Sequence, residues 1–326
     1  MIYTNQENIP LSLALWLAHD PYVVHPDPNS FSATSILKPL RSIVLSARMP
    51  LAPSTDIASR IAARLGQAIH DSVESSWLLG ADVREELLKS IGLPSGARSR
   101  ILINPGNIEM DDDVIPIYTE KRFERKLDQW LMTGTADFIV NGQLEDFKST
   151  KCYAYQKQSS AEKFIQQGSI YRWMDPAVIT EDHLVINYIF LDWMASKKKW
   201  EKNYPSSQIL TQKYPLMSLI ETENFIRRKL TAIAQNMQLP QEQLPLCSRE
   251  ELWQDNSVFK YYKNPNATKR STKNFDNGFA ADNHRIKMGV GIVKEVPGKA
   301  IFCRYCPAVT VCTQAENLIA ADLLDL

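Results

Sequence analysis

The chain has 326 residues, and its 37 basic and 37 acidic side chains give a formal net charge of zero. Hydrophobic residues make up 44% of the sequence and charged residues 23%, which is typical of a globular protein with enough apolar material for a core. A neutral chain has no global field that attracts polyanions, so binding driven by total charge is excluded. Any contact with nucleic acid must come from local basic patches, and the candidates are Lys197–Lys199 with Lys202, and Lys269-Arg270 with Lys273.

No apolar run is long enough for a membrane span. The stretch Leu11–Ala18 is short and no basic segment precedes it, so it is not typical of a signal peptide. Five cysteines are an odd number, and without an export signal structural disulfides are not expected. We therefore expect a cytoplasmic protein whose clustered thiols bind metal.

The N-terminal part is expected to be helical in short pieces. The pattern favours helices over Leu11–Ala18, over Phe31–Leu37 before the break at Pro39, and over Leu40–Arg48. Residues 56–79 predict a longer helix, because apolar residues recur every four positions and would form one buried stripe. Asp56 suits its N-terminus. The stripe consists of Ile57, Ile61, Leu65, Ile69, Val73 and Trp77, and His70 lies beside it.

Two short strands are expected next, over Ile101–Ile103 and Val114–Tyr118. The strongest local signal follows at Asn141-Gly142, which lies between two runs rich in β-branched and aromatic residues. Because both positions of a tight hairpin turn need positive φ, this pair predicts a β-hairpin over residues 134–151.

The hairpin register places charged side chains together. With a two-residue loop, Asp137 is opposite Asp146, and alternation places Lys148 on the same face. The two carboxylates would form a non-hydrogen-bonded pair with Cα atoms about 4.5 Å apart. Directly opposed like charges destabilise a sheet, and a divalent cation between them removes that penalty. The alternative is a solvated hairpin face on which Lys148 simply neutralises Asp146.

The second half of the chain continues with helices and one strand. Ser159-Ser160-Ala161-Glu162 has the form of a capping box and predicts a helix to about Met174, on which Gln167 and Tyr171 share a face. A strand over Leu184–Trp193 and a helix over Ser218–Asn236 follow. The expected division is an N-terminal helical segment over 1–55, a core over 56–236 and a loop-rich cysteine-bearing subdomain over 237–326.

Four short motifs occur in an order that resembles one family. They are Gly66-x3-His70, Gly134-Thr-Ala-Asp137, Asp146-Phe-Lys148 and Gln167-x3-Tyr171. This order resembles the RecB-like branch of the PD-(D/E)xK nucleases, which includes AddB nuclease domains, CRISPR-associated adaptation nucleases and phage exonucleases. The motifs span residues 66 to 171, about a third of the chain.

The resemblance implies an α/β restriction-endonuclease-like core, in which helices flank a central mixed sheet. It implies that Mg²⁺ or Mn²⁺ binds to Asp137 and Asp146, helped by His70 and the carbonyl of Phe147. Lys148 would orient the attacking water, while Gln167 and Tyr171 would contact DNA. Glu145 is excluded, because alternation points it to the opposite face from Asp146.

The C-terminal cysteines extend the resemblance. Cys303-x2-Cys306-x5-Cys312 is similar to the closing triplet of the iron–sulfur nucleases in this family, in which four thiolates hold a 4Fe–4S cluster. Those relatives carry their first cysteine before the histidine motif, but residues 32–41 contain none here. We expect Cys247 to be the fourth ligand, with Cys152 as its rival. A Cys₄ zinc site would use the same residues.

The expected function is therefore metal-dependent exonucleolytic hydrolysis of DNA that has a free end or is single-stranded. Two alternatives stay open: an endonuclease of restriction or CRISPR-adaptation type on the same core, and a non-catalytic DNA-binding protein with a zinc site. No helicase motif is present, so a helicase or recombination partner would be a separate chain. A phage origin is consistent with the resemblance.

Overall fold

A computed structural model describes residues 3–20, 25, 27, 29–49, 54–106, 111–266 and 269–326. The chain forms two compact units, the first within Met1–Leu37 and Pro53–Leu230 and the second within Lys38–Ala52 and Thr231–Leu326. The sequence-based division at residues 55 and 236 stays a prediction, but residues 38–52 group with the C-terminal part. No helix in the described ranges is long and apolar enough to cross a membrane.

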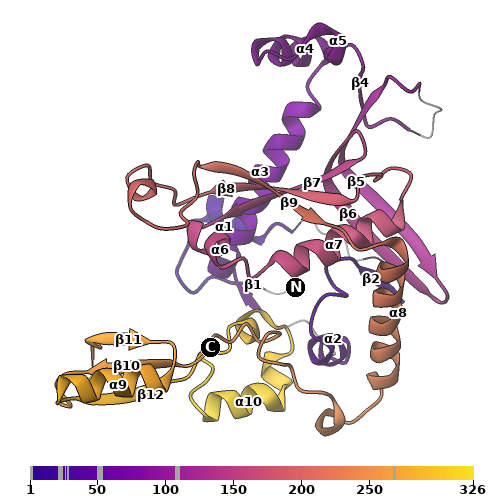
Figure 1. Ribbon diagram of the computed structural model, residues 1–326. Coiled ribbons are helices and arrows are strands. Elements are labelled where there is room, and N and C mark those ends of the chain that lie inside the picture. Colours follow the sequence, from indigo (N-terminus) through magenta and orange to yellow (C-terminus); the bar gives the residue numbers. More distant parts are fainter. Residues whose placement is uncertain are drawn as a thin grey trace. The chain divides into compact units, whose positions relative to one another are not determined.

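The first unit is built on a mixed sheet in the order β4-β5-β6-β7-β8-β9, with β2 paired to β6 (Figure 1). The pairs β4–β5, β7–β8 and β2–β6 are parallel, whereas β5–β6, β6–β7 and β8–β9 are antiparallel. The strands are β2 (Ser30–Ser32), β4 (Ile101–Ile103), β5 (Ile115–Leu127), β6 (Trp130–Val140), β7 (Gln143–Thr150), β8 (His183–Phe190) and β9 (Ile209–Pro215).

Helices flank this sheet, so the expected mixed α/β class is confirmed at that level. Figure 1 shows α7 along one face of the sheet and α3 extending from the other. The helices of this unit are α1 (Leu11–Ala18), α3 (Ile61–Trp77), α4 (Ala81–Ser90), α5 (Ser95–Arg98), α6 (Cys152–Lys157) and α7 (Ala161–Met174); α8 (Leu219–Asn236) begins in it, and β1 (Tyr3–Thr4) pairs with β3 (Thr55–Asp56).

The predicted hairpin is present. Asn141 and Gly142 have φ values of 48° and 82°, the positive values that a two-residue turn of this kind needs. Val140 pairs with Gln143, and the ladder continues to Phe138 and Glu145, where regular pairing between β6 and β7 ends. The predicted ladder pair of Asp137 and Asp146 is therefore not formed as a regular bridge, because the strands stop pairing one residue earlier.

The predicted buried stripe of the helix over 56–79 is formed only in part, because Ile57 is buried and Ile69, Val73 and Trp77 are half-buried. Ile61 and Leu65 are each 44% exposed, whereas Arg64 is 7% exposed. The reason is that α3 faces the sheet with Gly66, His70 and Trp77, which contact Ser149, Phe147 and Phe138. Asp56 does cap the start of the helical segment, since its side chain accepts a hydrogen bond from the backbone N–H of Ala58 at 3.0 Å.

Other expectations differ in detail. The segment 31–37 is not a helix: β2 occupies its start, because its backbone pairs with β6. The predicted capping box at Ser159–Glu162 is not formed, although α7 begins at Ala161 and ends at Met174 as expected. The strand predicted over Val114–Tyr118 extends to Leu127, since β6 pairs along nearly all of it.

The second unit contains α2 (Leu40–Ala47) and the C-terminal elements. Within it, β10 (Val258–Tyr262) lies between β11 (Lys273–Phe275) and β12 (Ile292–Val296) in an antiparallel sheet, and α9 (Gly278–Met288) packs on that sheet (Figure 1). The cysteine-bearing segment follows as short 3₁₀ turns over Phe302–Tyr305 and Val309–Val311, and then α10 (Thr313–Ala320).

Candidate functional site

The candidate site lies at a gap in the sheet beside β6. This strand pairs with β2 at residues 131–133 and with β7 at residues 138–140. Residues 134–137 have no ladder partner on that side among the described strands. The backbone N–H of Phe147 instead donates a hydrogen bond to the Asp137 carboxylate at 3.3 Å. The gap is thus where the motif Gly134-Thr-Ala-Asp137 places its acidic side chain.

His70 reaches this gap from α3. Its Nδ1 lies 3.3 Å from Oδ2 of Asp137, and its Nε2 lies 2.9 Å from the carbonyl oxygen of Phe147. The histidine, the carboxylate and the carbonyl that the sequence resemblance grouped therefore meet in space. Imidazole, carboxylate and carbonyl groups are all usable ligands for a divalent cation.

Glu120 belongs to the same group, although it was missed in the sequence. One ligand atom each of His70, Glu120 and Asp137 lies within 4.8 Å of the others. The β5–β6 pairing is interrupted at this level, where Glu120 has a φ of 46° and faces Asp137 in the register. The sequence does hold a signal for Glu120, namely the turn at Asp128-Gln129 between β5 and β6. When the pairing that starts at this turn is continued along both strands, Glu120 lies opposite Asp137.

The carboxylates at this gap repel one another. Burial and the adjacent charge of Asp146 hold the pKa of Asp137 well above its usual range. Burial, together with the charges of Glu74, Asp71 and Asp146, raises the pKa of Glu120 to about 7. A positive charge at the gap would lower the pKa of both carboxyl groups again. These ligand atoms therefore fit a divalent cation, whose charge would offset the repulsion between the carboxylates.

Asp146 and Lys148 form a close pair on β7. The Lys148 Nζ lies 2.8 Å from Oδ1 and 2.6 Å from Oδ2 of Asp146, and Asp146 is 8% exposed. Burial lowers the pKa of Lys148, but the negative charges of Asp146 and Asp137 outweigh that effect and keep it above its ordinary value. Lys148 is thus a fixed, protonated donor beside the carboxylates.

Gln167 and Tyr171 face the site from α7. The Gln167 amide donates a hydrogen bond to the Tyr171 hydroxyl at 2.8 Å, and burial raises the pKa of this phenol. A Cβ on Gly134 would lie 2.5 Å from Cε1 of Tyr171, so only glycine lets β6 approach the ring this closely. In contrast, a Cβ on Gly66 would lie 3.4 Å from Oγ of Ser149, an ordinary contact.

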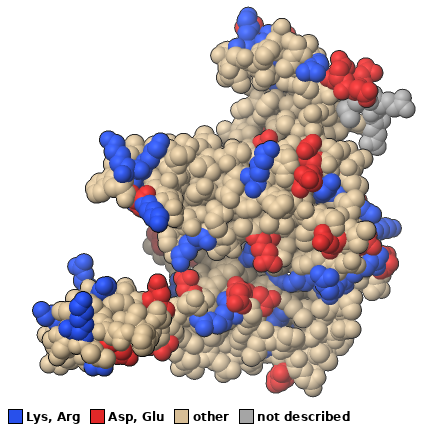
Figure 2. All heavy atoms as spheres, in the orientation of Figure 1, with Lys and Arg blue, Asp and Glu red and all other residues tan. Residues whose placement is uncertain are grey.

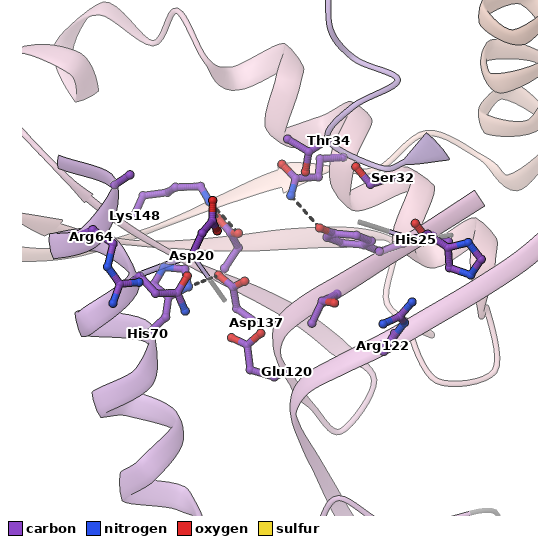
Figure 3. A pocket seen from close by; sticks show the side chains of 18 of the residues that line it. Asp20, His25, Ser32, Thr34, Arg64, His70, Glu120, Arg122, Asp137 and Lys148 are labelled. Atoms are coloured by element: carbon purple, nitrogen blue, oxygen red, sulfur yellow. Dashed lines mark hydrogen bonds and ion pairs between the residues drawn. The ribbon is translucent and has the colours of Figure 1, made fainter. Parts of the chain in front are cut away.

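These side chains line a cavity of about 560 Å³. In Figure 3, His70, Glu120 and Asp137 point toward one another, and Lys148 reaches in beside them. Basic side chains line the same cavity, namely Arg60, Arg64 and Arg122. The cavity also contains the predicted Asp146, Gln167 and Tyr171, so every predicted catalytic side chain of the first unit borders one space.

A second group of candidate ligands lies wholly within the second unit. Cys247, Cys303, Cys306 and Cys312 line one small cavity of about 20 Å³. Burial raises the pKa of the Cys247 thiol to about 12 and that of Cys303 to about 11. Cys152 is instead buried in the core of the first unit, and its backbone N–H donates to Asp192 at 2.7 Å.

A buried cation lies beside these thiols. Arg41 on α2 is 2% exposed, and its Nε donates to Sγ of Cys312 at 3.3 Å. Its remaining nitrogens donate to the carbonyls of Gln241 and Leu244 and to two side-chain oxygens. Oγ of the next residue, Ser42, lies 3.2 Å from Sγ of Cys306. Within the described residues Arg41 forms no ion pair with a carboxylate, so its positive charge is buried beside the thiols.

Comparisons with known proteins add little. No family model matches the chain, and no curated protein matches it. Among solved structures, the crystal structure of SSO0001 is 16% identical, covers 66% of this chain and 80% of its own, and superposes with a TM-score of 0.38. A likeness of this degree carries no argument about fold family or function.

Proposed function

We propose that this protein is a divalent-metal-dependent deoxyribonuclease of the PD-(D/E)xK type, RecB-like branch, that degrades DNA from free ends. The single observation that carries the proposal is the meeting of His70, Asp137 and the Phe147 carbonyl with the Asp146–Lys148 pair in one cavity. These groups come from three separate sequence motifs. A solvated hairpin face would not gather them or bury them.

His70, Glu120, Asp137, Asp146 and the carbonyl of Phe147 would hold Mg²⁺ or Mn²⁺. When bound, such a cation polarises a phosphoryl oxygen and lowers the pKa of a water molecule. The raised pKa of Asp137 and of Glu120 supports this assignment, because a cation removes the repulsion that raises them.

The protein's own side chains supply the remaining chemistry. Lys148 stays protonated beside Asp146, so it can orient a water and offset negative charge that develops at phosphorus. The hydrogen bond from Gln167 orients the hydroxyl of Tyr171 toward the cavity wall. Arg60, Arg64 and Arg122 line the same cavity. Arg60 is paired with Asp20 and Arg122 with Glu124, whereas Arg64 has no ion pair among the described residues and suits a phosphodiester substrate.

The four cysteines of the second unit are proposed to hold a structural 4Fe–4S cluster. All four line one small cavity in the second unit. The Cys303-x2-Cys306-x5-Cys312 spacing favours the cluster over a Cys₄ zinc site, and Arg41 would offset part of the negative charge of either. Iron and zinc analysis of anaerobically purified protein, with its visible absorption spectrum, distinguishes the two.

The test is a nuclease assay on end-labelled linear and on circular DNA, with and without Mn²⁺. Asp146→Asn and Lys148→Gln should each lower the rate by roughly 100-fold or more, because each removes a charge from the reacting centre. Glu145→Gln is the matched control: Glu145 is next to Asp146 but accepts a hydrogen bond from Asn187 at 2.7 Å instead.

The outcome decides between the proposed activities. Cleavage of linear but not circular DNA supports the exonuclease, whereas cleavage of both indicates an endonuclease on the same core. If Asp146→Asn and Lys148→Gln cleave DNA as fast as the wild type while remaining folded, the proposed site is wrong. If the protein binds DNA but shows no metal-dependent cleavage, it is a non-catalytic DNA-binding protein and not a nuclease.

A further inference from the structure

The three-stranded sheet of the second unit and its helix carry a local excess of positive charge. Residues 258–296 contain eight basic and three acidic side chains, a charge of +5 in a chain whose total is zero. Figure 2 shows basic side chains gathered over the part that β10, β11, β12 and α9 form. The basic residues are Lys260, Lys263, Lys269, Arg270, Lys273, Arg285, Lys287 and Lys294; we call this region the basic module.

Within the described part of the chain, most of these charges have no ion-pair partner. Of the eight, only Arg285 has an ion-pair partner among the described residues, Asp282 at 3.2 Å. The acidic Glu295 does not offset its neighbour Lys294, because successive side chains on β12 point to opposite faces. Seven basic side chains are therefore available to an external anion.

The sheet register brings two of them into direct opposition. Lys260 on β10 pairs with Lys294 on β12, so both side chains leave the same face at one level. Directly opposed like charges destabilise a sheet. On the other face, Tyr261 packs against His284 of α9, with ring centroids 4.9 Å apart, so the helix covers that side and leaves the lysine face uncovered by it.

The hairpin between β10 and β11 adds to the charge. It carries Lys263, Lys269 and Arg270 between its strands, and Lys273 follows at the start of β11. Its closure is regular, because the backbone N–H of Thr272 donates to the carbonyl of Tyr261 at 2.8 Å. The hairpin thus adds four basic side chains to the basic module, and so many cations on one short segment favour a polyanion over a single small anion.

We propose that the basic module is a second nucleic-acid contact, which binds the phosphate backbone of DNA without reading its sequence. The inference rests on the proposed function, because that function supplies DNA as the polyanion. Binding of this kind releases counterions, so it weakens steeply with salt. Its role is to hold long substrates, and it takes no part in the chemistry.

The test measures binding apart from cleavage. In the full-length Asp146→Asn background, without divalent cations, fluorescence anisotropy gives the affinity for labelled single-stranded and duplex DNA across a salt series. The variant Lys260→Gln/Lys263→Gln/Lys294→Gln removes three charges from the basic module. Its matched control, Lys89→Gln/Lys126→Gln/Lys213→Gln, removes three exposed charges from the first unit that lie outside both candidate basic patches.

The module variant should bind DNA roughly tenfold more weakly, and its plot of log affinity against log salt should be shallower by about 2 on single-stranded DNA and by about 3 on duplex DNA. The control should change neither. In the cleavage-competent chain, the same module variant should raise KM on long DNA and leave kcat unchanged. Circular dichroism confirms that each variant is folded.

Three outcomes would overturn the inference: unchanged DNA affinity and salt slope in the module variant, an equal loss in the lysine control, or no DNA binding by the parent chain. Failure of the proposed nuclease is recognised separately, because it shows as binding without cleavage and leaves the binding comparison valid.

Discussion

At the scale of single residues, Glu120 and Asp137 show how close acidic groups link stability to metal binding. Their carboxylates face each other across β5 and β6, and burial disfavours the charged form of both. When no cation is bound, the two carboxyl groups bind a proton instead, which lowers the cost of their buried negative charge. Protons and cations should therefore compete at the site.

Glu120 makes this competition measurable. Its pKa is about 7 in the folded protein against 4.5 as the ordinary value, so the folded state binds more protons between these limits. The free energy of unfolding should therefore fall as pH rises from about 4.5 to about 7. In Glu120→Gln this contribution, on the order of 2 kcal/mol, should be absent.

The measurement is urea unfolding of wild type and Glu120→Gln at both ends of this pH window, in chelator and then in Mn²⁺. Taking the difference between the two proteins cancels the titration of other carboxylates. Saturating Mn²⁺ should remove most of the wild-type pH dependence. Identical pH profiles for the two proteins in chelator would mean that Glu120 is not part of the charged group.

Residue patterns in the sequence predicted much of this site. His70, Asp137, Asp146, Lys148, Gln167 and Tyr171 all border one cavity, as the four motifs implied. Glu120 could not be found in the same way, because no motif marks it and its turn residues, Asp128-Gln129, are not a strong hairpin signal. Arg64 was missed because its position on α3 was hidden by the stronger apolar repeat.

At the scale of elements, the site depends on how closely α7 and β6 approach each other. Gly134 lies against the Tyr171 ring, whereas Gly66, in the histidine motif, has ordinary space around it. The two glycines of the motifs are therefore not equivalent. One is required by close packing, and the other only interrupts a helix.

Alanine substitutions should move stability in opposite directions. Gly134→Ala should lower the free energy of unfolding by about 1–3 kcal/mol, because the ring of Tyr171 must shift. Gly66→Ala should raise it by about 0.5–1 kcal/mol, since alanine favours the helical backbone of α3. Denaturant unfolding of both variants checks the signs. Stabilisation of Gly134→Ala would show that the close approach is not required.

The apolar stripe of α3 shows the limit of periodicity at this scale. A repeat every four residues correctly indicates a helix, but it does not say how much of the helix meets the sheet. Ile61 and Leu65 stay partly exposed because the side of α3 that meets the strands carries Gly66, His70 and Trp77. Its function in the fold is to hold His70 at the gap.

At the scale of the whole molecule, the chain has two compact units; the first contains the group at the gap in the sheet, and the second contains the four thiols. Carboxylates and imidazole in the first unit suit hard cations, and thiols in the second suit iron or zinc. Each ligand stabilises the unit that binds it. Unfolding should therefore occur in two transitions that respond to different metals.

Calorimetry of the metal-loaded protein tests this expectation. Mn²⁺ should raise one transition temperature by several degrees and leave the other unchanged. Arg41→Met should lower the second transition and reduce the bound iron or zinc, because it removes the hydrogen bond to Cys312 and a buried positive charge. Arg48→Met, an exposed change on the same helical segment, is the control. A single transition that Mn²⁺ and Arg41→Met both shift would contradict the expectation.

The sequence by itself determined the local features: the Asn-Gly turn, the type of most helices and strands, the sharing of one face by Asp146 and Lys148, and the grouping of three cysteines. These follow from backbone conformation and side-chain alternation, which act over a few residues. Only the tertiary structure decided that β6 and β7 part at Asp137, that Glu120 joins His70, and that Arg41 lies beside Cys312. Those contacts join residues far apart in the chain, and packing of whole elements, which no local pattern encodes, sets their distances.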